Sequence, residues 1–322
     1  MHFAVSGVDV NPFLPPLVAF VVSFFTSMGG VSGAFLLLPF QVSVLGFTSP
    51  AVSPTNLIFN IVAIPSGVYR YIREGRMAWP LTSVIIIGTL PGVIIGTILR
   101  VKYLPEPRAF MLFVGCVLLY IGGRMLYELF SWEGRSKEKI KAMEDKFKQR
   151  VERMRKERKA RLAAGLAPNA VVKTISASLG CIKYEFYGET YKFNTWVLLV
   201  LTLLVGIIGG TYGIGGGSMI APFLITFYSL PVYTVAGSTL MGSFITSVVG
   251  VVSYTIIAAV YAHTGFAIAP DWPLGILFGI GGTVGMYCGA RAQKYVPSRF
   301  IRFILGLLIT CLAVRYVLRY FS

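Results

Sequence analysis

The sequence has few charged residues for its length. Of its 322 residues, 13% are charged and 55% are hydrophobic, whereas a soluble globular chain carries about 25% charged residues. Lys and Arg are absent from Met1 to Tyr69 and again from Phe193 to Ala290. A bilayer confines basic residues to the connections between apolar runs in this way. The composition therefore excludes the two soluble domains that length alone would suggest and indicates a polytopic membrane protein.

Cysteine and histidine, which supply most disulfides and metal sites, are also scarce. The chain has four cysteines, none in a CxxC pair, and two histidines far apart, His2 and His263. This pattern argues against a disulfide or zinc framework. The stretch GIGGGS is not followed by the Lys of a phosphate-binding loop or by the acidic residue of a dinucleotide site. No base stands near a serine in the apolar runs, so we expect no enzyme activity, no cofactor and no metal.

Positive charge is concentrated in one segment. The net charge is +16, and 16 of the 29 Lys and Arg lie between Ser131 and Lys192 with 8 of the 13 Asp and Glu, which leaves +8 there. Charge placed in a connection is explained by membrane topology, so we expect no nucleic-acid partner and a cytoplasmic location for this segment. The chain is then a multi-pass protein of the cell membrane. It divides into a first membrane repeat (12–130), a basic cytoplasmic insertion (131–193) and a second membrane repeat (194–322).

The apolar runs differ in length. A full membrane span needs about 20 apolar residues, but Ala34–Gly46 and Met219–Leu230 are shorter and lie beside Gly, Ser and Pro. Such runs are typical of half-helices or re-entrant segments. The predicted fold is an all-α integral membrane protein. Each repeated half has about four to five membrane helices, with broken or re-entrant Gly-rich helices among them.

The two halves resemble each other. GGVSGAFLLLPF (Gly29–Phe40) parallels TYGIGGGSMIAPF (Thr211–Phe223). The same offset of 183 residues aligns further pairs: Pro39 with Pro222, Gly67 with Gly250, and Tyr71 with Tyr254. After a small shift, GVIIG (Gly92–Gly96) also matches GGTVG (Gly281–Gly285). This order of features indicates an internal duplication. The Arg and Lys counts leave open whether the halves are inverted or parallel; inverted repeats are common in transporters, and we favour them.

The glycine-rich breaks suggest a binding site. In the hydrocarbon core an unpaired backbone group costs several kcal/mol, so a break survives only where it lines a cavity or packs against protein. N–H groups at the start of the next half-helix attract anions, and glycine lets a ligand approach closely. Small polar residues follow each break, including Ser53 and Asn60 in the first half and Ser243 and Thr246 in the second. We expect these donors to hold a small oxyanion near the midplane. The predicted substrate-binding residues are Gly29, Gly30, Ser32, Gly33, Thr55, Asn56, Gly213, Gly215, Gly216, Gly217, Ser238 and Thr239.

Two simpler explanations compete with this site. Small residues four apart let helices touch, and Gly88, Gly92 and Gly96 are expected to do only that. The Gly213–Gly217 run could serve packing in the same way. Each hydroxyl could also bond the carbonyl four residues earlier in its own helix. Two breaks at equivalent positions of a duplication favour the site.

The central segment has its own pattern. Apolar residues recur at steps of three and four along Lys137–Leu162, which predicts an amphipathic helix, and CIKYEFYGETYKF predicts a short hairpin turning near Gly188. One interpretation is a connector lying on anionic lipid head groups. A dimerising coiled coil, which would make the chain a homodimer, and a regulatory or partner-binding insertion are the alternatives.

The duplicated glycine motifs, GGVSGAFLLLPF and GGTYGIGGGSMIAPF, are each followed by a helix bearing Ser and Thr. In this the chain resembles the TauE/SafE family of sulfite and organosulfonate exporters over both membrane halves. The resemblance implies that a small sulfur-containing anion is the partner, besides the lipid bilayer. It also implies roles for the residues that match the family's motifs: Gly29, Gly30, Gly33, Gly213, Gly215, Gly216, Pro222, Ser238 and Thr239. In the first half, SPTN (Ser53–Asn56) replaces the family's usual Gly-Thr/Ser step.

The predicted function is export of sulfite or a small organosulfonate by alternating access. No carboxylate proton relay is visible in the spans, and an inside-negative potential of 100 mV favours anion export by roughly 2.3 kcal/mol per charge. One alternative is an importer of thiosulfate or sulfate, which would need a coupling ion. The other is a non-transporting membrane scaffold that acts through the basic insertion.

Overall fold

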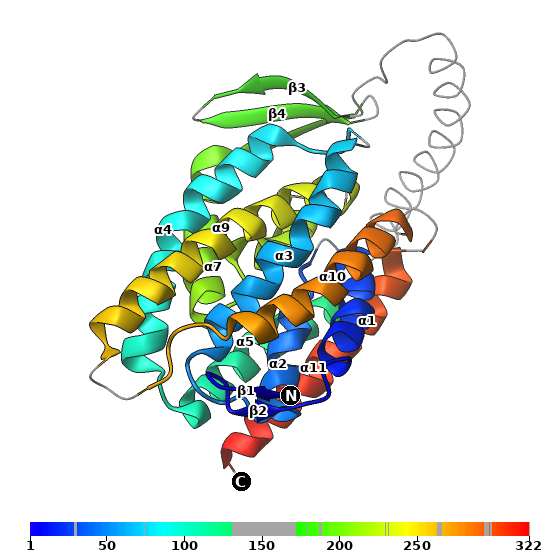
Figure 1. Ribbon diagram of the computed structural model, residues 1–322. Coiled ribbons are helices and arrows are strands. Elements are labelled where there is room, and N and C mark those ends of the chain that lie inside the picture. Colours follow the sequence, from blue (N-terminus) through cyan, green and yellow to red (C-terminus); the bar gives the residue numbers. More distant parts are fainter. Residues whose placement is uncertain are drawn as a thin grey trace.

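The computed structural model is a bundle of long helices with a small sheet at one end (Figure 1). The structure describes residues 1–28, 31–73, 75–130, 172–178, 180–186, 189–228, 230, 232–262, 266–292, 296 and 298–321. The amphipathic helix predicted at Lys137–Leu162 lies outside these residues, as do Gly29 and Gly30.

Five helices precede the central segment and five follow it among the described residues. The first set is α1 (Leu14–Met28), α2 (Ala34–Ser43), α3 (Val52–Arg73), α4 (Trp79–Tyr103) and α5 (Pro107–Phe130). The second set is α7 (Thr195–Tyr212), α8 (Gly216–Phe227), α9 (Val232–Val260), α10 (Trp272–Ala292) and α11 (Ser298–Phe321). In the described parts, five helices are long and apolar enough to cross a membrane, and they fall within α4, α5, α7, α9 and α10. The predicted all-α membrane fold is therefore confirmed, and α2 and α8 are the short half-helices expected after the two breaks.

Helices α4 and α7 pack through a ladder of glycines. A Cβ added to Gly92 would lie 2.4 Å from the Leu203 carbonyl oxygen, and one at Gly96 would lie 2.2 Å from that of Ile207. Only glycine lets the two backbones approach this closely. The packing role predicted for Gly88, Gly92 and Gly96 is thus confirmed. Because residue numbers rise together along the contact, α4 and α7 run parallel.

The same ladder recurs between α1 and α10. A Cβ at Gly281 would lie 1.8 Å from the Pro16 carbonyl oxygen, and one at Gly285 would lie 2.3 Å from that of Phe20. Gly289 meets Phe24 one turn later. The contacts align Gly92 with Gly285, so the sequence match of Gly92 with Gly281 was wrong by one helical turn. Glycines four apart make the two registers indistinguishable in the sequence.

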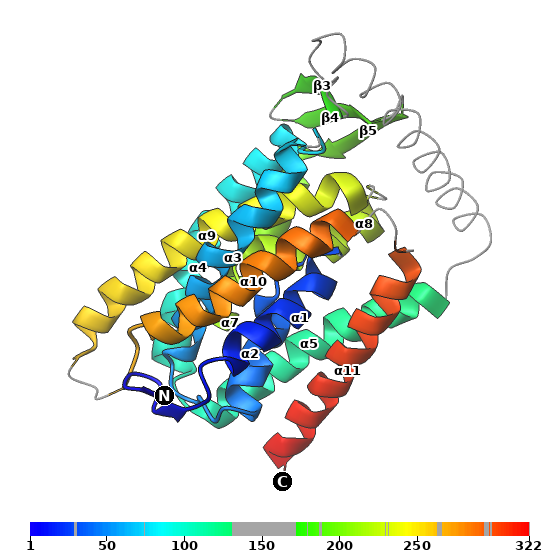
Figure 2. The ribbon, with the colours of Figure 1, turned by 45° about the vertical axis from the view of Figure 1, so that its right-hand side comes forward.

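The direction of the central helices relates the two halves. Helices α3 and α9 run antiparallel, because Gly67 contacts Leu240 while Gly250 contacts Leu57. At the offset of 183, Gly67 corresponds to Gly250 and Leu57 corresponds to Leu240. The two contacts therefore join the same two positions with the halves exchanged. The Tyr71 hydroxyl donates to the Ser27 carbonyl at 3.2 Å, and the Tyr254 hydroxyl donates to the Gly210 carbonyl at 3.0 Å, again at that offset. We infer an inverted arrangement, in which equivalent helices run in opposite directions (Figures 1 and 2).

The two ends of the bundle carry different small sheets. At one end, called here the sheet end, β3 (Val172–Ala177), β4 (Cys181–Phe186) and β5 (Glu189–Asn194) form an antiparallel sheet (Figure 2). The pairing of β4 with β5 is the predicted hairpin, whereas β3 was not anticipated. Tyr184 anchors this sheet to α9 through a 3.2 Å hydrogen bond with Thr234. Burial raises the pKa of the Tyr184 hydroxyl above its usual range, so that hydroxyl stays neutral.

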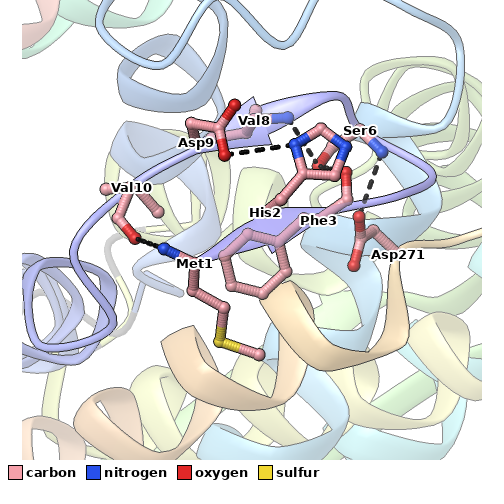
Figure 3. Close-up of polar contacts among 8 residues, drawn as sticks. All are labelled: Met1, His2, Phe3, Ser6, Val8, Asp9, Val10 and Asp271. Carbon is pink, nitrogen blue, oxygen red and sulfur yellow. Dashed lines mark hydrogen bonds and ion pairs between the residues drawn. The ribbon is translucent and has the colours of Figure 1, made fainter.

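The opposite end, called here the hairpin end, carries the strands β1 (His2–Phe3) and β2 (Val8–Asp9). The buried Phe3 and Val8 side chains join the bundle's apolar core. Figure 3 shows the polar contacts: His2 Nδ1 lies 3.1 Å from Asp9 Oδ1, and the Ser6 N–H donates to Asp271 Oδ2 at 3.0 Å. Asp271 is buried just before α10, so this contact ties the N-terminal hairpin to the membrane helices.

Candidate functional site

The second break, between α7 and α8, depends on two glycines with positive φ. Gly213 ends α7 with φ 87° and donates its N–H to the Gly209 carbonyl at 2.9 Å, which is a left-handed helix cap. Gly215 precedes α8 with φ 77°. Residues with a Cβ avoid this region of backbone conformation. The glycines of GTYGIGGG are therefore needed first of all to reverse the chain between the spanning helix α7 and the half-helix α8.

The N-terminus of α8 has donors without side-chain caps. The first N–H groups of an α-helix have no acceptor within the helix, and the N-cap residue Gly215 has no side chain to supply one. The helix dipole adds partial positive charge at the same place. Gly215 lies beside buried hydroxyls: its added Cβ would be 3.0 Å from Ser247 Oγ and 3.3 Å from Thr246 Oγ1. Thr246 Oγ1 donates to the Gly242 carbonyl at 2.7 Å, so the Ser247 hydroxyl and the α8 N–H groups are the donors here that suit a small oxyanion.

Asn56 on α3 brings the two breaks together. Its amide nitrogen donates to the carbonyls of both Ala34 and Gly213, each at 2.9 Å, and the side chain is fully buried. Its Oδ1 accepts a 3.2 Å hydrogen bond from Gln41 Nε2. The predicted meeting of the two breaks is therefore present in the fold. The amide donors of Asn56, however, bind backbone carbonyls, so its observed role is to brace the breaks.

Asn60 lies one turn further along α3 and extends this brace. Its amide nitrogen donates to the Ile214 carbonyl at 2.9 Å and to Ser247 Oγ at 3.1 Å. Its Oδ1 accepts a short hydrogen bond from the hydroxyl of Ser32, and that hydroxyl also accepts the Ala34 N–H at 3.2 Å. Ser32 thus satisfies the first donor of α2, whereas the N-cap of α8, Gly215, has no side chain that could do so.

The predicted hydroxyl layer does not form one shell. Thr55 Oγ1 donates to the Ala51 carbonyl at 2.7 Å, and Thr239 Oγ1 donates to that of Val235 at 3.0 Å. Ser238 Oγ donates to the Ala78 carbonyl at 3.2 Å. These contacts are mostly the ordinary bonds of a hydroxyl to its own helix. They leave the assignment of Thr55, Ser238 and Thr239 to an anion site untested.

Thr55 and Ser238 also lie toward opposite ends of the bundle. Thr55 Oγ1 accepts the Asp271 N–H at 2.8 Å, next to the hairpin end. Ser238 contacts Ala78 at the start of α4, next to the sheet end. They lie apart because α3 and α9 run antiparallel, and a shared role for them in binding one ligand stays a prediction.

The glycines that open α8 also pack closely. A Cβ at Gly217 would lie 2.3 Å from the Thr239 carbonyl oxygen, and one at Gly216 would lie 2.9 Å from the Thr89 side chain. On the first break, a Cβ at Gly33 would lie 2.6 Å from Ser23 Oγ. Packing is thus a real function of these glycines, and an anion at Gly216 and Gly217 requires α8 to separate from α9 and α4.

Two further buried residues lie near the second break and were not among the predicted site residues. The Tyr212 hydroxyl donates to the Phe35 carbonyl at 3.1 Å, which joins α7 to α2. Arg100, in the last turn of α4, is fully buried. Its position at the end of an apolar run makes it look like a topological anchor in the sequence. Tyr254 was visible in the duplication, but its contact with Gly210 could not be read from spacing.

Comparison with known proteins agrees with this architecture. The model of the family "Sulfite exporter TauE/SafE" matches residues 16–316. The chain is 23% identical over 293 residues to "Probable membrane transporter protein YunE" of Bacillus subtilis (strain 168), covering 88% of this chain and 90% of that protein. It is 23% identical over 125 residues to "Probable membrane transporter protein YdhB" of the same organism, covering 39% of this chain and 47% of that protein. No solved structure matches. The chain belongs to the sulfite exporter TauE/SafE family of membrane transporters.

Proposed function

We propose that this protein exports sulfite or a small organosulfonate from the cell by alternating access. The observation that carries the proposal is the N-terminus of α8, where uncapped N–H groups and the hydroxyls of Thr246 and Ser247 surround Gly215. An oxyanion accepts hydrogen bonds from the N–H groups and from the Ser247 hydroxyl, whereas Thr246 Oγ1 donates to the Gly242 carbonyl at 2.7 Å in this conformation. The family supplies the sulfur chemistry, because backbone N–H groups alone do not distinguish sulfite from sulfate or a carboxylate.

The proposed cycle uses the contacts between α8 and its neighbours. In the conformation described, Gly216 and Gly217 pack against α4 and α9, so the site is closed by backbone. Separation of α8 from α9 exposes the first-turn N–H groups to one end of the bundle. The amides of Asn56 and Asn60 keep the two breaks joined during this motion. We assign the sheet end to the cytoplasm, since the basic segment precedes the sheet in the sequence.

The direct test is efflux from proteoliposomes. Vesicles are loaded in parallel with sulfite, sulfate, thiosulfate, sulfoacetate or acetate, with the membrane potential clamped. We expect selective efflux of sulfite or sulfoacetate that quickens when the inside is made negative. Uptake that needs a proton or sodium gradient would instead indicate an importer. No flux of any anion would overturn the proposal and favour a scaffold.

A further inference from the structure

Arg100 is a buried cation within the membrane bundle. It lies in the last turn of α4, near the hairpin end, and its side chain is 0% exposed. Its Nη1 donates to the Leu104 carbonyl just beyond the helix. The guanidinium carbon lies 3.7 Å from the centroid of the Phe110 ring on α5. A basic side chain at a helix C-terminus and a cation over an aromatic face are both favourable, and they explain how one edge of this group is held.

The other edge of the guanidinium is open. Nε and Nη2 are both buried and have no hydrogen-bond partner. Within the described part of the chain, no carboxylate forms an ion pair with Arg100. A buried charge is costly unless it is paired and hydrogen-bonded. Nε and Nη2 lie along the same edge of the fork, which is the arrangement that binds an oxyanion through two parallel hydrogen bonds.

The register of α4 against α7 places Arg100 next to the second break. Thr211 Oγ1, near the end of α7, donates to the Gly96 carbonyl at 3.1 Å, and Arg100 follows Gly96 by one helical turn. On α9, the Tyr254 hydroxyl donates to the Gly210 carbonyl at 3.0 Å. Ser53 Oγ donates to the Tyr212 carbonyl at 3.3 Å, next to Gly213. Arg100 therefore stands beyond the break on its hairpin side.

We propose that Arg100 is a charged anion subsite on the route between the α8 N-terminus and the hairpin end. The substrate oxyanion binds side-on to the Nε–H and Nη2–H groups and so compensates the buried charge. This inference rests on the proposed function for the identity of the anion as sulfite or a sulfonate. Among the described buried residues, Arg100 is the only positively charged side chain beside the second break.

The test compares four purified proteins: the wild type, Arg100→Met, Arg100→Gln and Lys102→Met. Lys102 is exposed two residues further along α4, so Lys102→Met removes the same charge without touching the buried site. Each protein is measured for thermal unfolding with and without sulfite and for the KM of sulfite flux in proteoliposomes. Charge-assisted hydrogen bonds contribute enough that the two Arg100 variants should raise KM about tenfold or more. They should also lose the rise in Tm that sulfite gives the wild type.

A structural role for Arg100 predicts a different result. Loss of the contacts with Leu104 and Phe110 alone would lower the Tm of the anion-free protein but would leave the KM and the sulfite-dependent rise in Tm unchanged. If the Arg100→Met protein cannot be produced in folded form, the Arg100→Gln protein provides the test, because the glutamine amide can still donate to the Leu104 carbonyl. An unchanged KM together with an unchanged sulfite-dependent Tm in either variant would overturn the subsite.

The same measurements separate this inference from the proposed function. Sulfite flux by the wild type with no effect of Arg100 substitution would sustain the function and overturn the subsite. Sulfite stabilisation that depends on Arg100, without any wild-type flux, would sustain the subsite and overturn the function. Neither flux nor stabilisation in the wild type would overturn both.

Discussion

The two helix breaks occupy equivalent places in the two halves, yet they are held differently. At the first break, Ser32 accepts the Ala34 N–H and Asn56 binds the Ala34 carbonyl. At the second, Gly213 and Gly215 take positive φ. The N-cap residue is a glycine at both breaks, but among the described residues only α2 has its first N–H bound by a hydroxyl, that of Ser32. The difference teaches that similar sequence need not give a symmetric pair of breaks, and it is the reason that our proposal puts the anion at the second one.

The asymmetry originates on the helices that follow the breaks. At the offset of 183, Asn56 corresponds to Thr239 and Asn60 corresponds to Ser243. The two asparagines on α3 brace both breaks across the bundle, whereas Thr239 and Ser243 donate to carbonyls of their own helix. An amide reaches across an interface and presents two N–H donors, which a short hydroxyl cannot do. The first half therefore supplies the brace, and the second half supplies the open donors.

The largest effect is expected from Gly216→Val at the open break. Its Cβ would lie 2.9 Å from the Thr89 side chain and 3.0 Å from the Gly206 Cα, and its branches would cover the first-turn N–H groups. Sulfite efflux should be lost. The matched control is Gly67→Ala, also in a buried helix, where the nearest atom to the added Cβ is 3.7 Å away. Wild-type flux in Gly216→Val would remove the second break as the site.

Asn56→Ala should give the next largest effect. The change leaves the Ala34 and Gly213 carbonyls without this donor, and an unsatisfied buried group costs about 1–3 kcal/mol. We expect a clear fall in Tm and in flux. Thr239→Ala at the equivalent position removes a hydroxyl that donates to the Val235 carbonyl of its own helix, so we expect a smaller fall in Tm than for Asn56→Ala. Equal losses in the two variants would contradict the division of roles between the halves.

Gly92→Ala and Gly285→Ala sharpen the comparison in another way. Gly92 in the α4–α7 ladder corresponds to Gly285 in the α1–α10 ladder. An added Cβ would lie 2.4 Å and 2.3 Å, respectively, from the facing carbonyl oxygen. Each should destabilise the protein by similar amounts, about 1–3 kcal/mol as for other overpacked sites, measured by thermal unfolding. Neither should change the affinity for sulfite in the protein that remains folded. Strongly unequal Tm losses would argue against the inverted arrangement.

The smallest effect is expected from deletion of Lys137–Leu162. This stretch belongs to neither half, so the transporter interpretation predicts nearly unchanged efflux from proteoliposomes. A scaffold that works through the basic segment predicts loss of function instead. Flux abolished by the deletion in a folded protein would show that the segment takes part in transport.

The sequence was most informative where a pattern has a local cause. Apolar runs without charge predicted the membrane helices, and short runs beside glycine predicted α2 and α8. Glycines four apart predicted the close packing of α4. In each case the residues concerned are neighbours in the chain, so their spacing alone carries the physical argument.

It was least informative about partners across the bundle. Nothing in the spacing of Asn56 shows that its amide reaches both Ala34 and Gly213, and nothing near Thr55 shows that it meets Asp271. The antiparallel course of α3 and α9 decides which helix ends meet, and it places Thr55 and Ser238 toward different ends of the bundle. Arg100 was missed for the same reason, since only the fold reveals that the bundle covers it.

The central claim is that backbone N–H groups at the α8 N-terminus hold the anion. Crystals of the protein grown with selenite, a heavier analogue of sulfite, would test it through the anomalous signal of selenium. The account predicts a selenium peak directly beside the Gly216 and Gly217 nitrogens. The selenite oxygens, rather than the selenium itself, should lie within hydrogen-bond distance of these nitrogens. A selenium peak found only away from α8, or selenite that competes with sulfite for transport yet leaves α8 unoccupied, would contradict the claim.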